Sequence, residues 1–282
     1  MISLGIIFAI GSLICWGTAD YVQKLIFGKI NVKQLLFWSA PLNIIITAAF
    51  FPFFWEPTSF PLSSIIFAIV TGILNGLGLI FFLTALSKDK LSLVTSIGSA
   101  YPVITIILGI IILRENLSSI EGIGIAIVMI GVIAAGFVHT GKKFQLTSSM
   151  TILLFSELFW GFGFFFYKLS LPGLGWYAAT LINTVALAAV MVPFAYIKGD
   201  GHAAIKNNLL APIVFSIFLA VGGTLLYAFG ISIERTSIVT PISAMFPLVA
   251  IVLGYFFLKE KLQLHQYLGI ASVLIGIVLV SV

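Results

Sequence analysis

The sequence predicts an all-α polytopic membrane protein whose ten transmembrane helices form two inverted-topology five-helix repeats. The first observation behind this prediction is the composition: the 282 residues are 61% hydrophobic and 8% charged, whereas soluble domains carry about 25% charged residues. The second is a series of long apolar stretches, and the third is an internal repeat. With a mean hydropathy of +1.22, the chain has too little polar surface for a soluble enzyme, a nucleic-acid-binding protein or a disordered chain.

Polar breaks divide the chain into apolar stretches of the length that a membrane requires. A helix needs about 20 apolar residues to cross a bilayer core of about 30 Å. Because lipid offers no hydrogen-bond partners to the backbone, each stretch is expected to be helical. The predicted spans cover approximately residues 2–23, 34–55, 62–86, 91–113, 118–138, 149–171, 175–197, 209–232, 236–258 and 262–281.

The second half of the chain repeats the first at an offset of 144 or 145 residues. Apolar segments resemble one another by chance, but chance would not align tryptophans, mid-span prolines and glycines in the same order. We therefore predict a duplication, with one five-helix repeat over residues 1–141 and the other over residues 142–282. The aligned pairs include Trp16 with Trp160, Lys24 with Lys168, Thr95 with Thr240, Pro102 with Pro247, Gly124 with Gly269 and Gly131 with Gly276.

An odd number of spans in each repeat places the two repeats in opposite orientations across the membrane. Two similar halves in opposite orientation give two conformations of similar energy, each open to one side. Inverted repeats of this kind are typical of secondary transporters, whose substrate sites lie near the bilayer midplane where the repeats meet. A membrane receptor or scaffold is a weaker alternative, since it has no need of two balanced conformations.

Two short motifs recur in the repeats. A Trp-Gly pair lies in the first span of each half, and a basic residue followed by glutamate closes the fourth span, as Arg114-Glu115 and as Lys259-Glu260. With the ten spans in two halves, these motifs resemble the drug/metabolite transporter superfamily, EamA type, over the whole chain.

The resemblance implies a secondary active transporter that moves a small organic solute across the cell membrane by alternating access. Members of the superfamily export amino acids and drugs, import sugars or choline, exchange sugar phosphates or move lipid-linked sugars. Export of an amino acid, a drug or a related metabolite is therefore the first expectation. A sugar importer or a lipid-linked sugar flippase of the same fold is the alternative.

Most charges lie at the ends of the predicted spans, and the two exceptions are Glu157, about nine residues into the sixth span, and Asp20, near the end of the first. An isolated charge at the bilayer centre costs roughly 2.5–3.5 kcal/mol on insertion scales, and protonation avoids that cost. Because no histidine lies near the middle of a predicted span, we expect Glu157 first and Asp20 second to carry a coupling proton. The alternatives for Glu157 are a place in the headgroup zone or a hydrogen bond to a neighbouring helix. The alternative for Asp20 is an ion pair with Lys24, four residues on.

Pro102 and Pro247 lie near the middle of the fourth and ninth predicted spans. Proline removes a backbone N–H and frees the carbonyl four residues earlier, and broken helices of this kind line transporter cavities. We predict that both prolines mark gating kinks, with simple packing kinks as the alternative.

Polar and aromatic side chains near these features are the predicted substrate-binding, cavity-lining set. An aromatic ring can stack on a substrate or a cation, while membrane-embedded amides and hydroxyls can equally bond helices together. The predicted set is Trp16, Asp20, Asn75, Phe82, Thr95, Ser99, Tyr101, Glu157, Trp160, Tyr227, Thr240 and Ser243.

The basic residues are distributed unevenly between the two sides of the predicted topology. Eleven of the 14 Lys and Arg fall on one side, and the positive-inside rule then places both termini outside the cell. Many members of the superfamily have both termini inside, which is the alternative that the resemblance implies.

Several kinds of chemistry have no supporting motif. The sequence contains neither a GxxxxGK phosphate loop nor an HExxH metal motif, and its single cysteine, Cys15, forms neither a disulfide nor a metal cluster within the chain. We therefore expect no enzymatic activity, no cofactor, no metal and no nucleic-acid partner. The expected partners are the lipid bilayer, a small-molecule substrate and a proton or another ion. The sequence leaves the substrate, the direction of transport, the coupling ion and the oligomeric state open.

Overall fold

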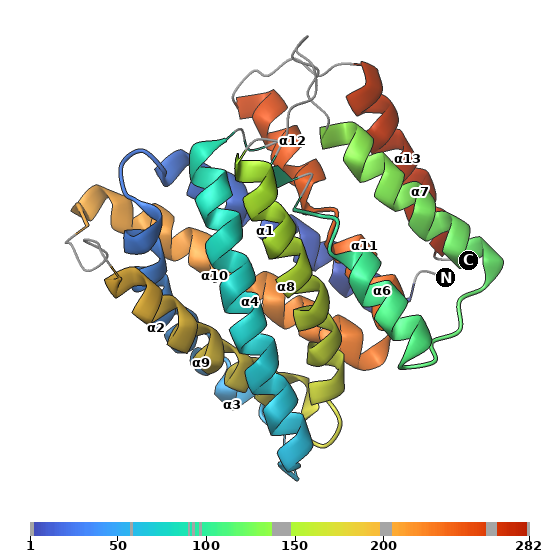
Figure 1. Ribbon diagram of the computed structural model, residues 1–282, viewed down its shortest axis with the longest axis horizontal. Helices are drawn as coiled ribbons and strands as arrows, with labels where there is room; N and C mark the ends of the chain where they lie inside the picture. Colours follow the sequence, from blue (N-terminus) through green and yellow to red (C-terminus); the bar gives the residue numbers. More distant parts are fainter. Residues whose placement is uncertain are drawn as a thin grey trace.

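The computed structural model describes residues 3–56, 59–89, 91, 94–95, 98–136, 148–197, 205–257 and 264–280. Within this part of the chain all regular elements are helices, apart from one isolated bridge between Phe27 and Ile30. The helices form a single bundle (Figure 1), as the apolar composition predicts. Their bounds are α1 Leu4–Ile26, α2 Val32–Ala49, α3 Phe51–Phe54, α4 Leu62–Lys88, α6 Pro102–Ile111, α7 Ser119–Gly136, α8 Ser148–Ser170, α9 Gly175–Tyr196, α10 Asn207–Ile233, α11 Thr236–Ser243, α12 Phe246–Phe257 and α13 Leu264–Val280.

In the described part of the chain, seven helical segments are long and apolar enough to cross a membrane. One of them, Thr236–Phe257, combines α11 and α12. Shorter apolar helices at Pro102–Ile111, Ser119–Gly131 and Tyr267–Gly276 lie within the other predicted spans. The all-helical, multi-pass architecture that the sequence predicts is therefore confirmed.

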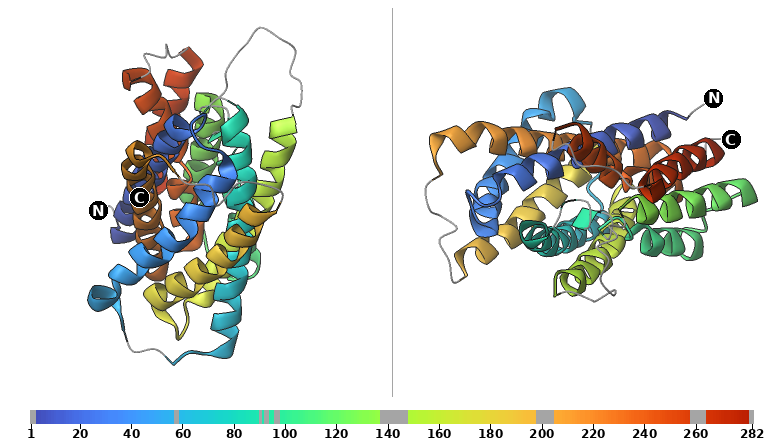
Figure 2. Two further views of the ribbon diagram at one scale, coloured as in Figure 1. Left: turned by 90° about the vertical axis from the view of Figure 1, so that its left-hand side faces the viewer. Right: turned by 90° about the horizontal axis from the view of Figure 1, so that it is seen from above.

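Helices from the two halves of the chain pack against one another. The most extensive contacts join α1 with α10, α4 with α8 and α7 with α13, and each pair joins one helix from either half. The α7–α13 pair lies at one edge of the bundle, side by side in all views (Figure 2). Neither half therefore forms its own separate core.

Glycines allow several of these close helix contacts. A Cβ atom on Gly131 would lie 2.8 Å from the Gly269 carbonyl oxygen, and one on Gly276 would lie 2.8 Å from the Gly124 carbonyl oxygen. These reciprocal contacts hold α7 against α13. On the other side of the bundle, a Cβ atom on Gly72 would lie 2.3 Å from the Asn183 carbonyl oxygen, where α4 meets α9.

The ninth predicted span is interrupted in its middle. Helix α11 ends at Ser243 and α12 begins at Phe246, which places Pro247 in the first turn of α12. Pro102 occupies the corresponding place as the first residue of α6. Proline is well tolerated in a first turn because the N–H that it lacks has no intrahelical partner there. Both prolines therefore begin a half-helix rather than bend a continuous one.

The second predicted span, residues 34–55, is shorter in the structure. Helix α2 ends at Ala49, and the backbone N–H of Phe50 bonds to the Thr47 carbonyl oxygen in a tightened last turn. A separate short helix, α3, then begins at Phe51 with Pro52 in its first turn. Pro52 has no N–H to donate to the preceding turn, so the α2 ladder cannot run on through it.

Candidate functional site

A cavity of about 160 Å³ lies in the middle of the bundle, between α1, α2, α4, α8, α9 and α10. Both halves of the chain contribute to its wall. Half of the predicted substrate-binding set lines it, namely Trp16, Asp20, Asn75, Phe82, Tyr101 and Trp160. Further polar lining comes from Gln23, Ser39, Asn43, Thr47, Asn183, Thr184 and Thr224.

Aromatic rings form a continuous part of the cavity wall. The ring of Phe164 lies 5.8 Å from that of Trp16 and 4.8 Å from that of Tyr101. The ring of Trp160 lies 5.8 Å from Tyr101 and 5.0 Å from Phe82. These contacts are stacked, tilted or edge-on, and aromatic pairs at such separations attract one another, so the rings support one another around the cavity.

Each tryptophan of the Trp-Gly motif packs on a glycine of the opposite half. A Cβ atom on Gly78 would lie 2.5 Å from Cδ1 of Trp160, and one on Gly223 would lie 2.6 Å from Cδ1 of Trp16. The indole N–H of Trp16 also donates to the Ala220 carbonyl oxygen at 3.2 Å. The two indoles are thereby held against the backbones of α4 and α10.

Asp20 lines the cavity, but the expected alternative of an ion pair with Lys24 is not formed. The Lys24 ammonium group donates instead to the carbonyl oxygens of Leu86 at 2.8 Å and Asp89 at 2.5 Å, at the end of α4. Among the described residues, Asp20 has no hydrogen-bond or ion-pair partner. The cavity wall therefore contains a carboxylate whose nearest lysine in sequence is engaged elsewhere.

Lys168 makes the equivalent contacts in the second half. Its ammonium group donates to the carbonyl oxygens of Ile231 and, at 3.0 Å, Glu234. Leu86 and Asp89 correspond to Ile231 and Glu234 at the 145-residue offset. Each lysine thus satisfies carbonyl groups at the C-terminal end of a helix, where the helix dipole favours a cation.

Glu157 is buried beside the cavity rather than on its wall, with 6% of its surface exposed. Its Oε2 accepts a hydrogen bond of 2.6 Å from the backbone N–H of Tyr101, which immediately precedes α6. A carboxylate at this end of a helix is stabilised by the helix dipole. The hydrogen bond to a neighbouring helix that we considered as an alternative is therefore present.

The other predicted binding residues are buried near the cavity but do not form its described wall. The hydroxyl groups of Tyr227 and Thr240 are hydrogen-bonded at 2.8 Å, and Thr95 donates to the Leu91 carbonyl oxygen at 2.9 Å. Ser99 and Ser243 are also buried. The contact of Tyr227 with Thr240 joins α10 to α11, whereas the Thr95 bond runs to the residue four positions earlier in the same segment.

Two aromatic cavity residues, Phe164 and Phe246, were absent from the predicted set although the internal repeat could have found them. Phe164 corresponds to Asp20 and Phe246 corresponds to Tyr101 at the repeat offsets, and both line the cavity. Gln23, one helical turn after Asp20 on the same face of α1, could have been found from its spacing.

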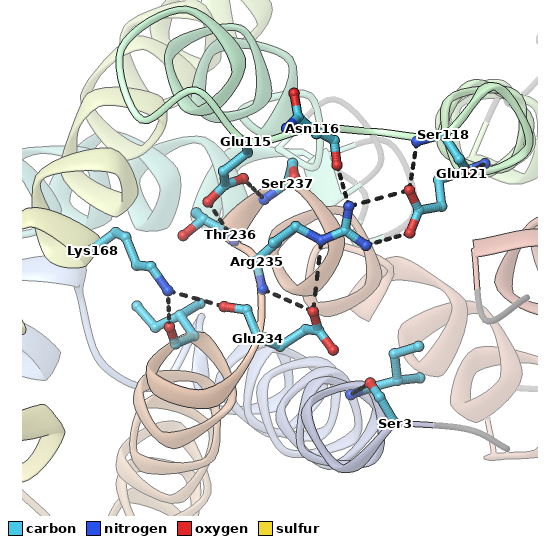
Figure 3. A network of polar contacts seen from close by, with 12 residues as sticks. Ser3, Glu115, Asn116, Ser118, Glu121, Lys168, Glu234, Arg235, Thr236 and Ser237 are labelled. Atoms are coloured by element: carbon cyan, nitrogen blue, oxygen red, sulfur yellow. Dashed lines mark hydrogen bonds and ion pairs between the residues drawn. The ribbon is translucent and has the colours of Figure 1, made fainter.

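A polar network lies where the α6–α7 connection meets the start of α11 (Figure 3). Glu115 accepts hydrogen bonds from the backbone N–H groups of Thr236 at 3.0 Å and Ser237 at 2.9 Å, so it caps α11. Arg235 pairs with Glu121, and this contact raises the pKa of Arg235. The glutamate of the first basic–Glu motif is therefore a helix cap, whereas Lys259-Glu260 lies outside the described residues.

The described architecture is that of a multi-pass membrane protein with an aromatic central cavity shared by two related halves. The model of the EamA-like transporter family matches residues 3–137 and again residues 147–282. The chain belongs to this family, which confirms the resemblance to the drug/metabolite transporter superfamily. Membership implies a membrane transporter of small solutes rather than an enzyme.

Individual proteins also resemble the chain. An uncharacterized protein from Methanocaldococcus jannaschii is 27% identical over 140 residues, which cover 49% of this chain and 98% of that protein. A solved crystal structure of a protein superposes with a TM-score of 0.76 and 13% identity, covering 99% of this chain and 96% of that one. The second similarity is one of fold alone.

Proposed function

We propose that this protein is a secondary active transporter that moves a small organic solute across the cell membrane by alternating access, in the direction of export. The observation that carries the proposal is the central cavity, whose wall is shared by equivalent residues of two related halves. Trp16 and Trp160 occupy matching places on either side of it. A site between the halves changes its access when one half moves relative to the other.

The proposal includes ten spans and inverted repeats. With five spans in each half, the second half enters the membrane in the opposite orientation. The Lys24 contacts with α4 and the Lys168 contacts with α10 would then lie at opposite faces of the membrane. We propose that these two clusters close opposite entrances in turn, with the half-helices that begin at Pro102 and Pro247 moving between the two states.

Proton coupling through Glu157, with Asp20 as the second candidate, is the remaining part of the proposal. Its support is the hydrogen bond from the Tyr101 backbone to Glu157, because the ring of Tyr101 lines the cavity. Protonation of Glu157 would remove negative charge from the start of α6 and weaken this bond. A proton at Glu157 would thereby alter the position of a cavity residue.

Counterflow in proteoliposomes tests the transport function. Solutes that raise the unfolding temperature of the purified protein are first selected from amino acids, sugars, amines and other small metabolites. Vesicles loaded with an unlabelled selected solute should take up its radiolabelled form faster than protein-free vesicles. A solute that binds but shows no counterflow in sealed, protein-containing vesicles would favour a receptor instead.

A further inference from the structure

The cavity wall has one formal negative charge among its described residues and no Lys, Arg or His. Asp20 supplies that charge, and Lys24 is turned away to the end of α4. An unpaired carboxylate in a low-dielectric interior is costly. Its charge can be balanced by a proton or by a ligand that brings a positive charge into the cavity.

The aromatic residues around Asp20 favour an organic cation over a metal ion. Trp and Tyr rings attract cations within about 6 Å of the ring centre, and Trp16, Trp160 and Tyr101 all line the cavity. Mg²⁺ and Ca²⁺ need about six or more oxygen ligands, while the described residues contain no cluster of three or more His, Cys, Asp or Glu side chains.

The volume of the cavity restricts the size of such a cation. A protein cavity of about 150 Å³ holds a molecule the size of benzene, and this cavity measures about 160 Å³. The amide groups of Gln23, Asn43 and Asn183 also line the wall and offer oxygen atoms to N–H donors. A compact amine therefore matches the cavity in size, charge and hydrogen bonding.

We propose that the cavity binds a small organic cation, an amine or ammonium compound, with its positive head at Asp20 between the indoles of Trp16 and Trp160. This inference rests on the proposed transport function, because it names the substrate class of the same cavity. An ammonium head donates hydrogen bonds to the Asp20 carboxylate, while the carbon skeleton contacts the aromatic rings.

Three probes that share one carbon skeleton test the charge requirement in the wild-type protein. They are 3,3-dimethylbutylamine, which is cationic at neutral pH, the neutral 3,3-dimethylbutan-1-ol and the anionic 3,3-dimethylbutanoate. Isothermal titration calorimetry of the purified full chain should give an association constant at least about tenfold higher for the amine than for the alcohol, with the acid weakest. Equal binding of the amine and the alcohol, or no binding of the amine, would overturn the proposal.

Two pairs of variants then locate the binding site. Asp20→Asn should weaken amine binding at least about tenfold and leave the alcohol unaffected, whereas Glu56→Gln removes an exposed carboxylate and should change neither. Trp160→Leu should weaken amine binding about three- to tenfold, with Trp55→Leu, outside the cavity, as its control. Amine binding that survives Asp20→Asn unchanged would place the cation elsewhere and contradict the proposal.

Flux measurements separate this proposal from that of transport. Amine binding that depends on Asp20 without amine counterflow would support the cation site and contradict the transport function. Counterflow of neutral or anionic solutes with no amine binding would support the transport function and contradict the cation site. Excess NaCl, compared with KCl at equal ionic strength, tests a sodium site: specific loss of amine binding in NaCl would assign Asp20 to an inorganic cation and overturn the proposal.

Discussion

At the residue scale, the internal repeat places the tryptophan of each Trp-Gly motif against a helix of the other half of the chain. Trp16 and Trp160 each pack against a glycine of the opposite half, at separations that leave no room for a Cβ atom. A small change on α4 or α10 therefore reaches a cavity residue contributed by the other half. Adjacent glycines on α10 allow this coupling to be tested, because only one of them contacts an indole.

Gly223→Ala should destabilise the protein, whereas Gly222→Ala should not. A Cβ atom at position 223 would lie 2.6 Å from Trp16 Cδ1, while one at position 222 would meet nothing within 4 Å. Overpacking of this kind costs about 1–3 kcal/mol. Thermal unfolding in detergent should show a lower midpoint for Gly223→Ala alone, and equal midpoints for both variants would contradict the packing of Trp16 on α10.

Glu157→Gln should separate exchange from accumulation. Glutamine keeps the size of the side chain but cannot take up and release a proton. In reconstituted vesicles with an imposed pH gradient, we expect the variant to exchange substrate but not to concentrate it. Glu56→Gln, at an exposed position, should behave as the wild type. Accumulation by Glu157→Gln at the wild-type level would move the coupling role to Asp20 or to another ion.

At the scale of elements, the broken ninth span depends on a cap supplied from elsewhere in the chain. Helix α11 has only eight residues, and its first backbone N–H groups bond to Glu115 in the α6–α7 connection. So short a helix has little stability of its own. The cap therefore connects the position of α11 to that of the neighbouring connection (Figure 3).

Glu115→Ala should lower the stability of the protein by about 0.5–2 kcal/mol, the usual value of a lost N-cap. Glu115→Gln should lose less, because an amide oxygen still accepts a hydrogen bond but carries no charge for the helix dipole. Thermal or denaturant unfolding measures both changes, with Glu56→Ala as the exposed control. An effect of Glu115→Ala no larger than that of the control would show that the cap is dispensable.

On the scale of the whole molecule, the contacts of the basic residues group the helix ends in the same way as the predicted membrane topology does. Lys24 bonds to the end of α4, and Lys33 bonds to the Ile197 carbonyl oxygen after α9. Arg235, by contrast, joins Glu121 and Asn116. These contacts match the two groups into which the predicted topology divides the Lys and Arg residues.

Cysteine labelling in intact cells should reveal which group faces the cytoplasm. In a Cys15→Ser background, a cysteine at Lys206 should be protected from an impermeant reagent, and one at Glu56 should react, if the positive-inside rule places the termini outside. Both side chains are exposed, and permeabilised cells provide the control for reactivity. Labelling of the Lys206 site alone would reverse the orientation and support the arrangement common in the superfamily.

How far the sequence could predict the site is clearest at Asp20 and Glu157. Both carboxylates stood out because charges are rare in apolar spans, but spacing offered a partner only to Asp20, namely Lys24. The partners were decided by other helices: the Tyr101 backbone for Glu157, and the end of α4 for the lysine beside Asp20. These two contacts join residues that are 56 and 62 positions apart in the sequence. The local sequence around each residue therefore does not predict them.

The sequence by itself determined the all-helical membrane fold, because a polar backbone in lipid must bond within each apolar segment, and it determined the internal duplication. Only the tertiary structure decided that α1 packs on α10 and α4 on α8, and hence which side chains of the two halves share one cavity. Helix association in a membrane depends on close packing of small residues and on a few polar contacts. The glycine that packs against each indole can be identified only from the tertiary structure, because it lies on a helix of the other half.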